Sequence, residues 1–248
     1  MMKAIYETKG RAREYCELAV NLYTGCSHNC IYCYGAAVTH QNKEQWGQNP
    51  QPRKGIIQQI QRDAERYSKL NEKRPILMCF VTDPYQPVDD THRLARKAIL
   101  ILKSYNLRVV ILTKAGIRVQ RDWDLLDKRD AFATTLTLLN QEDSQTWEPG
   151  AALPAERMEN LRQAHELGLE TWVSCEPVIY PEATLELIRL TAPFVDHYKV
   201  GTLNYHPHGK TIDWPKFARD VKQLLEGLGK RYYLKRDLAE YLKGGKHG

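Results

Sequence analysis

The stretch Cys26-Ser-His-Asn-Cys30-Ile-Tyr-Cys33 decides how the fold and function of this sequence are interpreted. It places three of the chain's six cysteines within eight residues. Disulfide scaffolds are short, secreted and dense in cysteine, whereas this chain has 248 residues, so the group predicts a metal site. The remaining three cysteines stand singly, at Cys16, Cys79 and Cys175.

Three thiolates at this spacing predict a site with one open coordination position. Structural zinc sites normally have four ligands, so zinc would need His28 or a distant cysteine to complete its shell. Thiolates also bind iron–sulfur clusters, and a [4Fe–4S] cluster held by three thiolates keeps one iron free for another ligand. The residues alone therefore leave both zinc and iron–sulfur open.

The composition is that of an ordinary globular protein. Lys and Arg number 36 and Asp and Glu number 30, which gives a formal net charge of +6. This excess permits an anionic partner such as DNA or RNA without requiring one. No stretch approaches the roughly 20 apolar residues of a transmembrane helix, and the N-terminus lacks the apolar core of a signal peptide. We therefore expect a cytoplasmic protein with no membrane partner.

Apolar runs alternate with amphipathic stretches along almost the whole chain. Strands are predicted at residues 18–23, 76–81, 108–113, 132–139, 170–174, 197–200 and 232–234. Helices are predicted at residues 55–70, 91–104, 122–128, 156–167, 183–190, 214–225 and 238–242. This alternation predicts an α/β fold with parallel strands, a partial (β/α)6-type TIM-like barrel. We expect one domain over residues 1–248, with a core of about 17–205 and a C-terminal extension, 206–248, that closes the barrel.

The carboxyl ends of parallel strands meet at one mouth of such a barrel, where these folds carry their chemistry. The cysteine stretch follows the first predicted strand, so we place the metal site at this C-terminal mouth. Other polar side chains end later strands, or lie in the loops that follow, and should ring the same mouth: Thr82, Asp83, Lys114, Thr135, Glu148, Glu176 and Asn204.

The spacing Cys-x3-Cys-x2-Cys, with Tyr32 directly before the last cysteine, resembles the signature of the radical S-adenosylmethionine (SAM) superfamily. The resemblance implies that Cys26, Cys30 and Cys33 each hold one iron of a [4Fe–4S] cluster. The fourth iron would take the amine and carboxylate of SAM, whose reductive cleavage gives a radical that removes hydrogen from a substrate. An electron donor such as flavodoxin or ferredoxin is implied as a partner.

A second set of motifs resembles the spore photoproduct lyase branch of this superfamily. The motifs are TDPYQP at 82–87, LTK at 112–114, TT at 134–135 and EP at 148–149, followed by Pro154 and Arg157. In that branch, hydroxyls after the second and fourth strands and a lysine after the third contact SAM. Thr82, Thr135 and Lys114 match those places. The resemblance also implies that the backbone of Tyr32 contacts the adenine.

The sequence departs from this branch at the residue that supplies a hydrogen atom to the product radical. That cysteine lies two residues before the first SAM-contacting hydroxyl, where this chain has Phe80. Cys79 is one residue away and, because strand side chains alternate between faces, it should be a buried core thiol. Two other residues are candidate catalytic groups: Cys175, which ends the fifth strand, and Tyr34, beside the cysteines. Core packing for Cys175 and loop packing for Tyr34 are the alternatives.

Two further segments carry residues of interest near the predicted mouth. His206 and His208 follow the sixth strand and are candidates for binding substrate or a proton, or else belong to a solvated loop. Residues 230–236 interleave basic and aromatic side chains. That pattern suits phosphate contact with base stacking, but it also suits an ordinary strand.

We therefore expect a radical SAM enzyme with a [4Fe–4S] cluster and SAM as cofactors. The favoured substrate is a nucleic-acid lesion or modified base, because the resembled branch acts on DNA and the chain is basic. A small metabolite or a peptide is the alternative substrate, since a fold does not fix its function. An alternative of another class is a non-catalytic iron–sulfur or zinc-binding protein, although such a protein does not need the set Thr82, Lys114 and Thr135.

Overall fold

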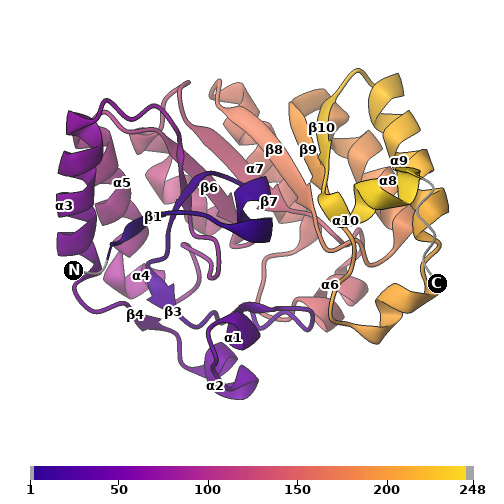
Figure 1. The fold of residues 1–248 in the computed structure, drawn as a ribbon, viewed down its shortest axis with the longest axis horizontal. Coiled ribbons are helices and arrows are strands. Elements are labelled where there is room, and N and C mark those ends of the chain that lie inside the picture. The colour runs from indigo at the N-terminus through magenta and orange to yellow at the C-terminus, as the bar shows by residue number, and fades with distance from the viewer. Residues whose placement is uncertain (1–2, 244–248) are drawn as a thin grey trace.

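A computed structural model describes residues 3–243 and shows one large sheet with helices packed against it (Figure 1). Residues 1–2 and 244–248, the two ends of the predicted domain, lie outside the described residues. The sheet order is β1-β2-β5-β6-β7-β8-β9-β10, and of these described strands only β1 runs antiparallel to its neighbour. The strands are β1 (Ile5–Glu7), β2 (Leu18–Val20), β5 (Ile76–Met78), β6 (Val109–Thr113), β7 (Ala131–Thr135), β8 (Glu170–Cys175), β9 (His197–Val200) and β10 (Arg231–Leu234). A small second sheet pairs β3 (Tyr23–Thr24) with β4 (Gln51–Pro52).

Helices connect the parallel strands and cover the outer face of the sheet (Figure 1). The longer ones are α3 (Ile56–Lys69), α5 (Leu94–Ser104), α7 (Pro154–Glu166), α8 (Pro181–Thr191) and α9 (Trp214–Gly227). The shorter ones are α1 (Gly35–Val38), α2 (Lys43–Gln48), α4 (Asp89–His92), α6 (Gln141–Trp147) and α10 (Arg236–Ala239). Because successive parallel strands lie side by side in sequence order, the sheet is a partial barrel, which confirms the predicted fold class.

Alternation of side chains along each strand separates two layers of core. On β2 and β5, Leu18 and Ile76 belong to the large core shared with the helices. Their neighbours Ala19 and Leu77 belong to a smaller core on the inner face, together with Trp172 of β8. A residue at the carboxyl end of a strand therefore faces either the helices or the interior of the barrel, according to its place in this alternation.

An N-terminal segment that the sequence did not predict lies across the inner face of the sheet. After β1 the chain forms a 3₁₀ turn, Gly10–Glu14, seen in indigo near the centre of Figure 1. Lys199 of β9 donates hydrogen bonds to the carbonyl oxygens of Glu14 and Tyr15, at 2.9 and 2.5 Å. The Tyr233 hydroxyl of β10 donates to the Glu14 carboxylate at 3.1 Å. Residues 10–15, named the strap below, thus join the first strands to the last ones.

Several elements differ from the sequence prediction. Only residues 122–125 of the predicted helix over 122–128 are helical, as the end of a 3₁₀ turn, Gly116–Leu125, and the predicted strand 132–139 ends at Thr135. Helix α6 was not predicted because its sequence is mostly polar; the Asn140 side chain caps it by accepting a hydrogen bond from the Asp143 amide at 2.8 Å. No helix within residues 3–243 is long and apolar enough to cross a membrane.

The predicted C-terminal extension contributes β10, which pairs with β9 at the edge of the sheet. Helix α9 precedes this strand and α10 follows it. The single domain over residues 1–248, with 206–248 closing the barrel, stays a prediction. Within the described chain, the strap lies across the inner face in addition to this extension.

Candidate active site

A cavity of about 490 Å³ opens at the carboxyl ends of the parallel strands. Small-molecule sites typically enclose about 300–1,000 Å³, so this cavity is large enough for a cofactor or a substrate. Its wall contains eight of the nine predicted site residues: Cys26, Cys30, Cys33, Tyr32, Tyr34, Thr82, Lys114 and Thr135. The ninth, Cys175, is not among the residues that line it.

The cysteine loop is held in place by segments outside it. The Cys26 amide donates a hydrogen bond to the carbonyl oxygen of Trp46, in α2, at 3.0 Å. Gly150, which follows α6, packs so closely on the loop that a Cβ there would lie 2.2 Å from the Ser27 carbonyl oxygen. Its amide also donates to the carbonyl oxygen of His28 at 3.0 Å. Segments far away in the sequence therefore fix the loop that carries the thiols.

The three thiols line one cavity, where Cys26 and Cys30 are buried and Cys33 is partly buried. Burial raises the pKa of Cys30 to about 12, while the positive charge of Lys114 acts in the opposite direction. Among residues 3–243, no three His, Cys, Asp or Glu side chains converge on a point where one metal ion would bind. A [4Fe–4S] cluster takes each thiolate on a different iron, so separated thiols fit a cluster better than a mononuclear zinc site.

Asp83 connects the loops that follow β5 and β6 to the cysteine loop. Its carboxylate accepts hydrogen bonds from the Thr113 hydroxyl at 2.8 Å and from the Lys114 amide at 2.7 Å. Nδ1 of His28 lies 3.5 Å from the same carboxylate. Burial lowers the pKa of His28, although Asp83 acts against this shift. Nε2 of His28 is buried and has no partner among the described residues, so it is available to a ligand in the cavity.

The three predicted SAM contacts share the cavity wall with the cysteines. The Thr82 hydroxyl is buried and lies beside the Cys79 thiol. The ammonium of Lys114 lies 5.7 Å from the centre of the Tyr32 ring. Burial opposes its charge, but the negative charges of Cys30 and Glu148 hold the pKa of Lys114 above its usual value. A buried polar atom without a partner costs about 1–3 kcal/mol, so Nε2 of His28 on this wall fits a polar ligand that supplies the missing hydrogen bond.

A buried ion pair behind this wall supports it. Arg157 and Glu148 are 1% and 0% exposed, with 2.6 Å between their charged groups. The Tyr32 hydroxyl donates to Glu148, and Arg157 donates to the carbonyl oxygen of Thr135 at 3.0 Å. Burial raises the pKa of Glu148, but the positive charges of Arg157 and Lys114 bring it below its usual value. The pair therefore positions wall residues from outside the cavity.

The family model described as "Radical SAM superfamily" matches residues 20–194, which is more than half of the chain. The chain belongs to the radical SAM superfamily. It is accordingly a radical SAM enzyme, and the cofactors of the superfamily are a [4Fe–4S] cluster and SAM. This match confirms the resemblance drawn from the three cysteines and Tyr32.

The radical SAM protein is also similar to individual proteins. The uncharacterized protein ORF301 of Acidianus two-tailed virus is 25% identical over 239 residues, covering 86% of this chain and 77% of that protein. A solved structure of a spore photoproduct lyase variant has a TM-score of 0.71 at 16% identity, covering 94% of this chain and 79% of that one. SuiB of Streptococcus suis, bound to SAM, has a TM-score of 0.67 at 12% identity, covering 93% and 53%. The solved structures thus share the fold.

The two predicted catalytic residues of this radical SAM enzyme lie in different surroundings. Cys175 ends β8 with its side chain toward the helices, in the core that contains Val173 and Val200. It is fully buried, and burial raises the pKa of its thiol to about 12. Tyr34 lines the cavity, and its hydroxyl donates to the carbonyl oxygen of Phe80 at 3.4 Å. The structure therefore brings Tyr34 to the cysteines and does not bring Cys175 there.

The two histidines after β9 pack against an aromatic side chain. The ring centres of His206 and His208 lie 4.8 and 5.8 Å from that of Trp147. His208 Nε2 lies 3.0 Å from the carbonyl oxygen of Ile179. Neither histidine is among the residues that line the cavity. They are therefore packed in a loop beside the site, whereas the sequence suggested either a role at the mouth or a solvated loop.

The sequence analysis missed cavity residues that come from the two ends of the chain. Tyr15 of the strap and Lys235, directly after β10, both line the cavity. The basic and aromatic pattern over 230–236 included Lys235 but gave it no separate role. Residues 231–234 of that segment form β10, and both of its tyrosine hydroxyls donate to glutamates. No local pattern marks Tyr15.

Proposed function

We propose that this radical SAM enzyme holds its cluster through Cys26, Cys30 and Cys33 and acts on a nucleic-acid lesion or modified base. When bound, the cluster and SAM together supply the radical that removes a hydrogen atom from the substrate. The observation that carries the proposal is that these three thiols share one cavity wall with the Lys114 ammonium and the hydroxyls of Thr82 and Thr135.

Thr82, Thr135 and Lys114 are the proposed contacts to SAM. The two hydroxyls can donate to or accept from its polar groups, and the ammonium can pair with its carboxylate. Lys114 stays charged because Cys30 and Glu148 hold its pKa above the usual value despite burial. Tyr32, whose hydroxyl is fixed by Glu148, keeps its backbone in place for contact with the adenine.

Tyr34 is the proposed group that passes a hydrogen atom between cofactor and substrate. Its ring lies 6.0 Å from that of Phe80, and both rings line the cavity. Burial raises the pKa of Tyr34 well above its usual value, so its hydroxyl keeps its proton at neutral pH. A neutral phenol next to the cysteines can give up a hydrogen atom, which a phenolate cannot.

A nucleic-acid substrate is supported by the content of the cavity and by one neighbour. Lys9 lines the cavity in addition to Lys114, and so do Arg11 and Lys235, which are paired with Asp237 and Glu176. Cations beside aromatic rings suit phosphate contact and base stacking. Spore photoproduct lyase, which shares the fold, was solved with a dinucleoside spore photoproduct.

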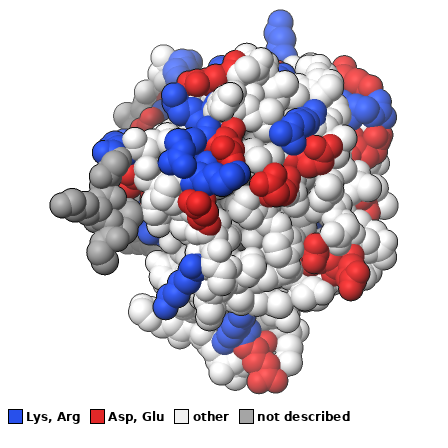
Figure 2. Space-filling model, turned by 90° about the vertical axis from the view of Figure 1, so that its right-hand side faces the viewer, with Lys and Arg blue, Asp and Glu red and all other residues white. Residues whose placement is uncertain are grey.

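The outer surface adds a constraint on how a nucleic acid would bind. Figure 2 shows positive and negative side chains interspersed on the face at the right-hand side of Figure 1, near α8 and α9. On that face the excess of +6 charges forms no continuous basic track. This supports binding of a short stretch or a single base in the cavity, in preference to a long duplex along that face.

A peptide is the second candidate substrate, because SuiB of Streptococcus suis shares the fold and was solved bound to its precursor peptide. Membership of the superfamily removes the non-catalytic zinc or iron–sulfur alternative. We further propose flavodoxin or ferredoxin as the electron donor, since cleavage of SAM needs one electron from outside the chain. A cytoplasmic location remains part of the proposal.

Anaerobic reconstitution with iron and sulfide tests the proposed reaction. We expect a brown protein that converts SAM to methionine and 5′-deoxyadenosine under dithionite. A colourless, zinc-containing protein that leaves SAM intact would overturn the proposal. Fluorescence anisotropy with single-stranded DNA then tests the substrate: affinity that falls steeply with added salt supports a nucleic acid. If the active protein binds no DNA or RNA even at low salt, a peptide substrate is favoured.

A further inference from the structure

The part of the cavity wall that follows β8 and β10 contains an ion pair that the proposed cofactor contacts do not use. Nζ of Lys235 lies 2.5 Å from Oε2 of Glu176, and their side chains are 2% and 17% exposed. The Tyr15 hydroxyl donates to the same oxygen, Oε2. The ammonium of Lys235 also lies 3.4 Å from the centre of the Tyr15 ring. All three residues line the cavity.

Gly201, directly after β9, provides the space that this group occupies. A Cβ at this position would lie 2.8 Å from Cδ of Glu176 and 2.9 Å from Cδ of Lys235. Gly201 does not have the positive φ that requires glycine elsewhere in the chain, so its lack of a side chain serves the close approach. The fold therefore keeps room for the pair at the cavity wall.

The carboxylate of Glu176 has one occupied oxygen and one available oxygen. Oε2 receives both Tyr15 and Lys235, whereas Oε1, which lies beside Gly201, accepts no hydrogen bond from the residues that the structure describes. A carboxylate can only accept hydrogen bonds, so the available oxygen needs a donor. Because Lys235 balances its charge, the group presents a fixed acceptor without strongly repelling an anionic substrate.

Aromatic rings connect this acceptor to the cysteine loop. The rings of Tyr15 and Phe80 meet edge to face, with their centres 5.6 Å apart, and Phe80 lies 6.0 Å from Tyr34. These three side chains all line the cavity. A flat group that hydrogen-bonds to Glu176 would therefore lie against aromatic surface that leads toward the thiols.

We propose that Glu176 anchors the substrate by accepting a hydrogen bond from an N–H or O–H group on a flat part of it. Burying two charges costs free energy, so a pair kept at a cavity wall, with one oxygen available, fits a binding role better than a purely structural one. A nucleobase fits this description, because it is planar and carries N–H donors. The inference rests on the proposed nucleic-acid substrate, and Glu176 is the residue that would hold its base. Tyr15 and Lys235 are positioning residues, because they fix the carboxylate.

Calorimetric titration of the reconstituted protein tests this anchor, with SAM bound and no reductant present. The probes are the dinucleotide thymidylyl-thymidine and its N3-methylated analogue, which keeps the planar rings but lacks the N–H donor. We expect the wild-type protein to bind the unmethylated probe about ten-fold more tightly. In Glu176→Gln, the amide oxygen stays with Tyr15 and Lys235, the NH₂ group takes the place of Oε1 and cannot accept a hydrogen bond, and this preference disappears. Glu186→Gln, an exposed change on α8, is the matched control and should retain it.

The inference is overturned if the wild-type protein binds both probes equally or neither, or if Glu176→Gln keeps the preference. Tyr15→Phe provides a second variant, since it keeps the ring but removes one of the two donors that fix the carboxylate; it should weaken the preference. SAM cleavage without substrate is measured in parallel. Its absence in the wild-type protein would be a failure of the proposed function. Its presence with equal binding of both probes would refute the anchor alone, and its presence with binding of neither probe would refute the nucleic-acid substrate as well.

Discussion

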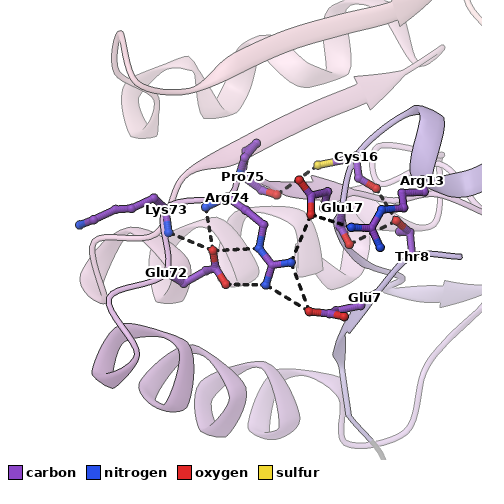
Figure 3. A network of polar contacts seen from close by, with 9 residues as sticks. All are labelled: Glu7, Thr8, Arg13, Cys16, Glu17, Glu72, Lys73, Arg74 and Pro75. Atoms are coloured by element: carbon purple, nitrogen blue, oxygen red, sulfur yellow. Dashed lines mark hydrogen bonds and ion pairs between the residues drawn. The ribbon is translucent and has the colours of Figure 1, made fainter.

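The two ends of the barrel differ in how completely their polar side chains are partnered. At the amino ends of the strands, Arg74 forms ion pairs with Glu7, Glu17 and Glu72 at 3.2, 3.3 and 2.7 Å (Figure 3). The Arg74 side chain is 33% exposed and shares its donors among all three partners. At the carboxyl ends, the cavity wall instead keeps buried polar groups that have no partner within the described residues. The first arrangement is complete without a ligand, and the second leaves room for one beside partnered groups such as Glu176 and Lys235.

The same contrast holds for cysteine. At the amino ends, the Cys16 thiol donates to the carbonyl oxygen of Pro75 at 3.1 Å, as Figure 3 shows. The Thr8 hydroxyl donates to the carbonyl oxygen of Cys16 at 2.5 Å. Thiols on the cavity wall, such as that of Cys30, face a space large enough for a cofactor. A residue type therefore indicates function only together with what surrounds it.

The largest expected effect separates the thiols of the two ends. We expect Cys30→Ala, reconstituted anaerobically, to form no detectable 5′-deoxyadenosine, because the proposed cluster would lose one of its three ligands. Cys16→Ala, at the other end, should cleave SAM like the wild-type protein. Chromatography of the nucleoside products after reduction measures both. SAM cleavage by Cys30→Ala would refute the ligand assignment. Loss of SAM cleavage in Cys16→Ala would show that a thiol at the amino ends of the strands is needed as well.

The next effect concerns stability and compares two arginines. Arg157→Met leaves Glu148 buried without its ion pair, so the free energy of unfolding should fall by about 3–5 kcal/mol. Arg74→Met removes a partly exposed network and should cost about 1 kcal/mol or less. Urea denaturation of both variants beside the wild-type protein measures these differences. Equal losses would show that burial does not distinguish the two networks.

A smaller effect is expected at Cys175 and tests whether its thiol takes part in catalysis. The sequence placed this residue at the mouth, and the structure places it in the core. We expect Cys175→Ala to retain SAM cleavage and to lose about 1 kcal/mol of stability, because it removes one buried sulfur from a packed core. The nucleoside assay and urea denaturation are again the measurements. Loss of SAM cleavage in a variant that remains folded would restore a catalytic role for this thiol.

The smallest effect is a pH dependence of the stability that the Arg74 ion pairs contribute. Hydrogen bonds from Arg74 lower the pKa of Glu72 to about 2, from an ordinary value of 4.5. As the pH falls, the Glu72 carboxylate becomes protonated near 4.5 in the unfolded chain but only near 2 in the folded one. The stabilisation is therefore complete above 4.5 and is lost as the pH falls toward 2. Denaturation midpoints of the wild-type protein and Arg74→Met should therefore converge over this range. A constant difference down to the acid end would contradict the ion-pair explanation.

Part of the site could be predicted because its residues are close in sequence or follow a regular repeat. Tyr32 and the three thiols lie in one short loop, so no long-range contact is needed to assemble them. Thr82, Lys114 and Thr135 could be placed at one mouth because successive parallel strands end at the same edge of the sheet.

The face of a strand residue was harder to predict than its position along the strand. Cys175 does end β8 as expected, but its side chain packs toward the helices. Its neighbours Ser174 and Glu176 point the other way, and the Tyr15 hydroxyl contacts both. A shift of one residue exchanges the two faces, and a fully buried strand is apolar on both, so its pattern gives no guide.

The sequence by itself determined the cysteine loop, the parallel partial barrel and the edge where its polar residues gather. These features follow from local spacing and from periodicity, both of which are written along the chain. Only the tertiary structure decided the opposite wall, where Tyr15 of the strap meets Lys235 after the last strand. That contact joins the two ends of the described chain across the inner face of the sheet. It depends on how the whole sheet curves and closes, which no local pattern records.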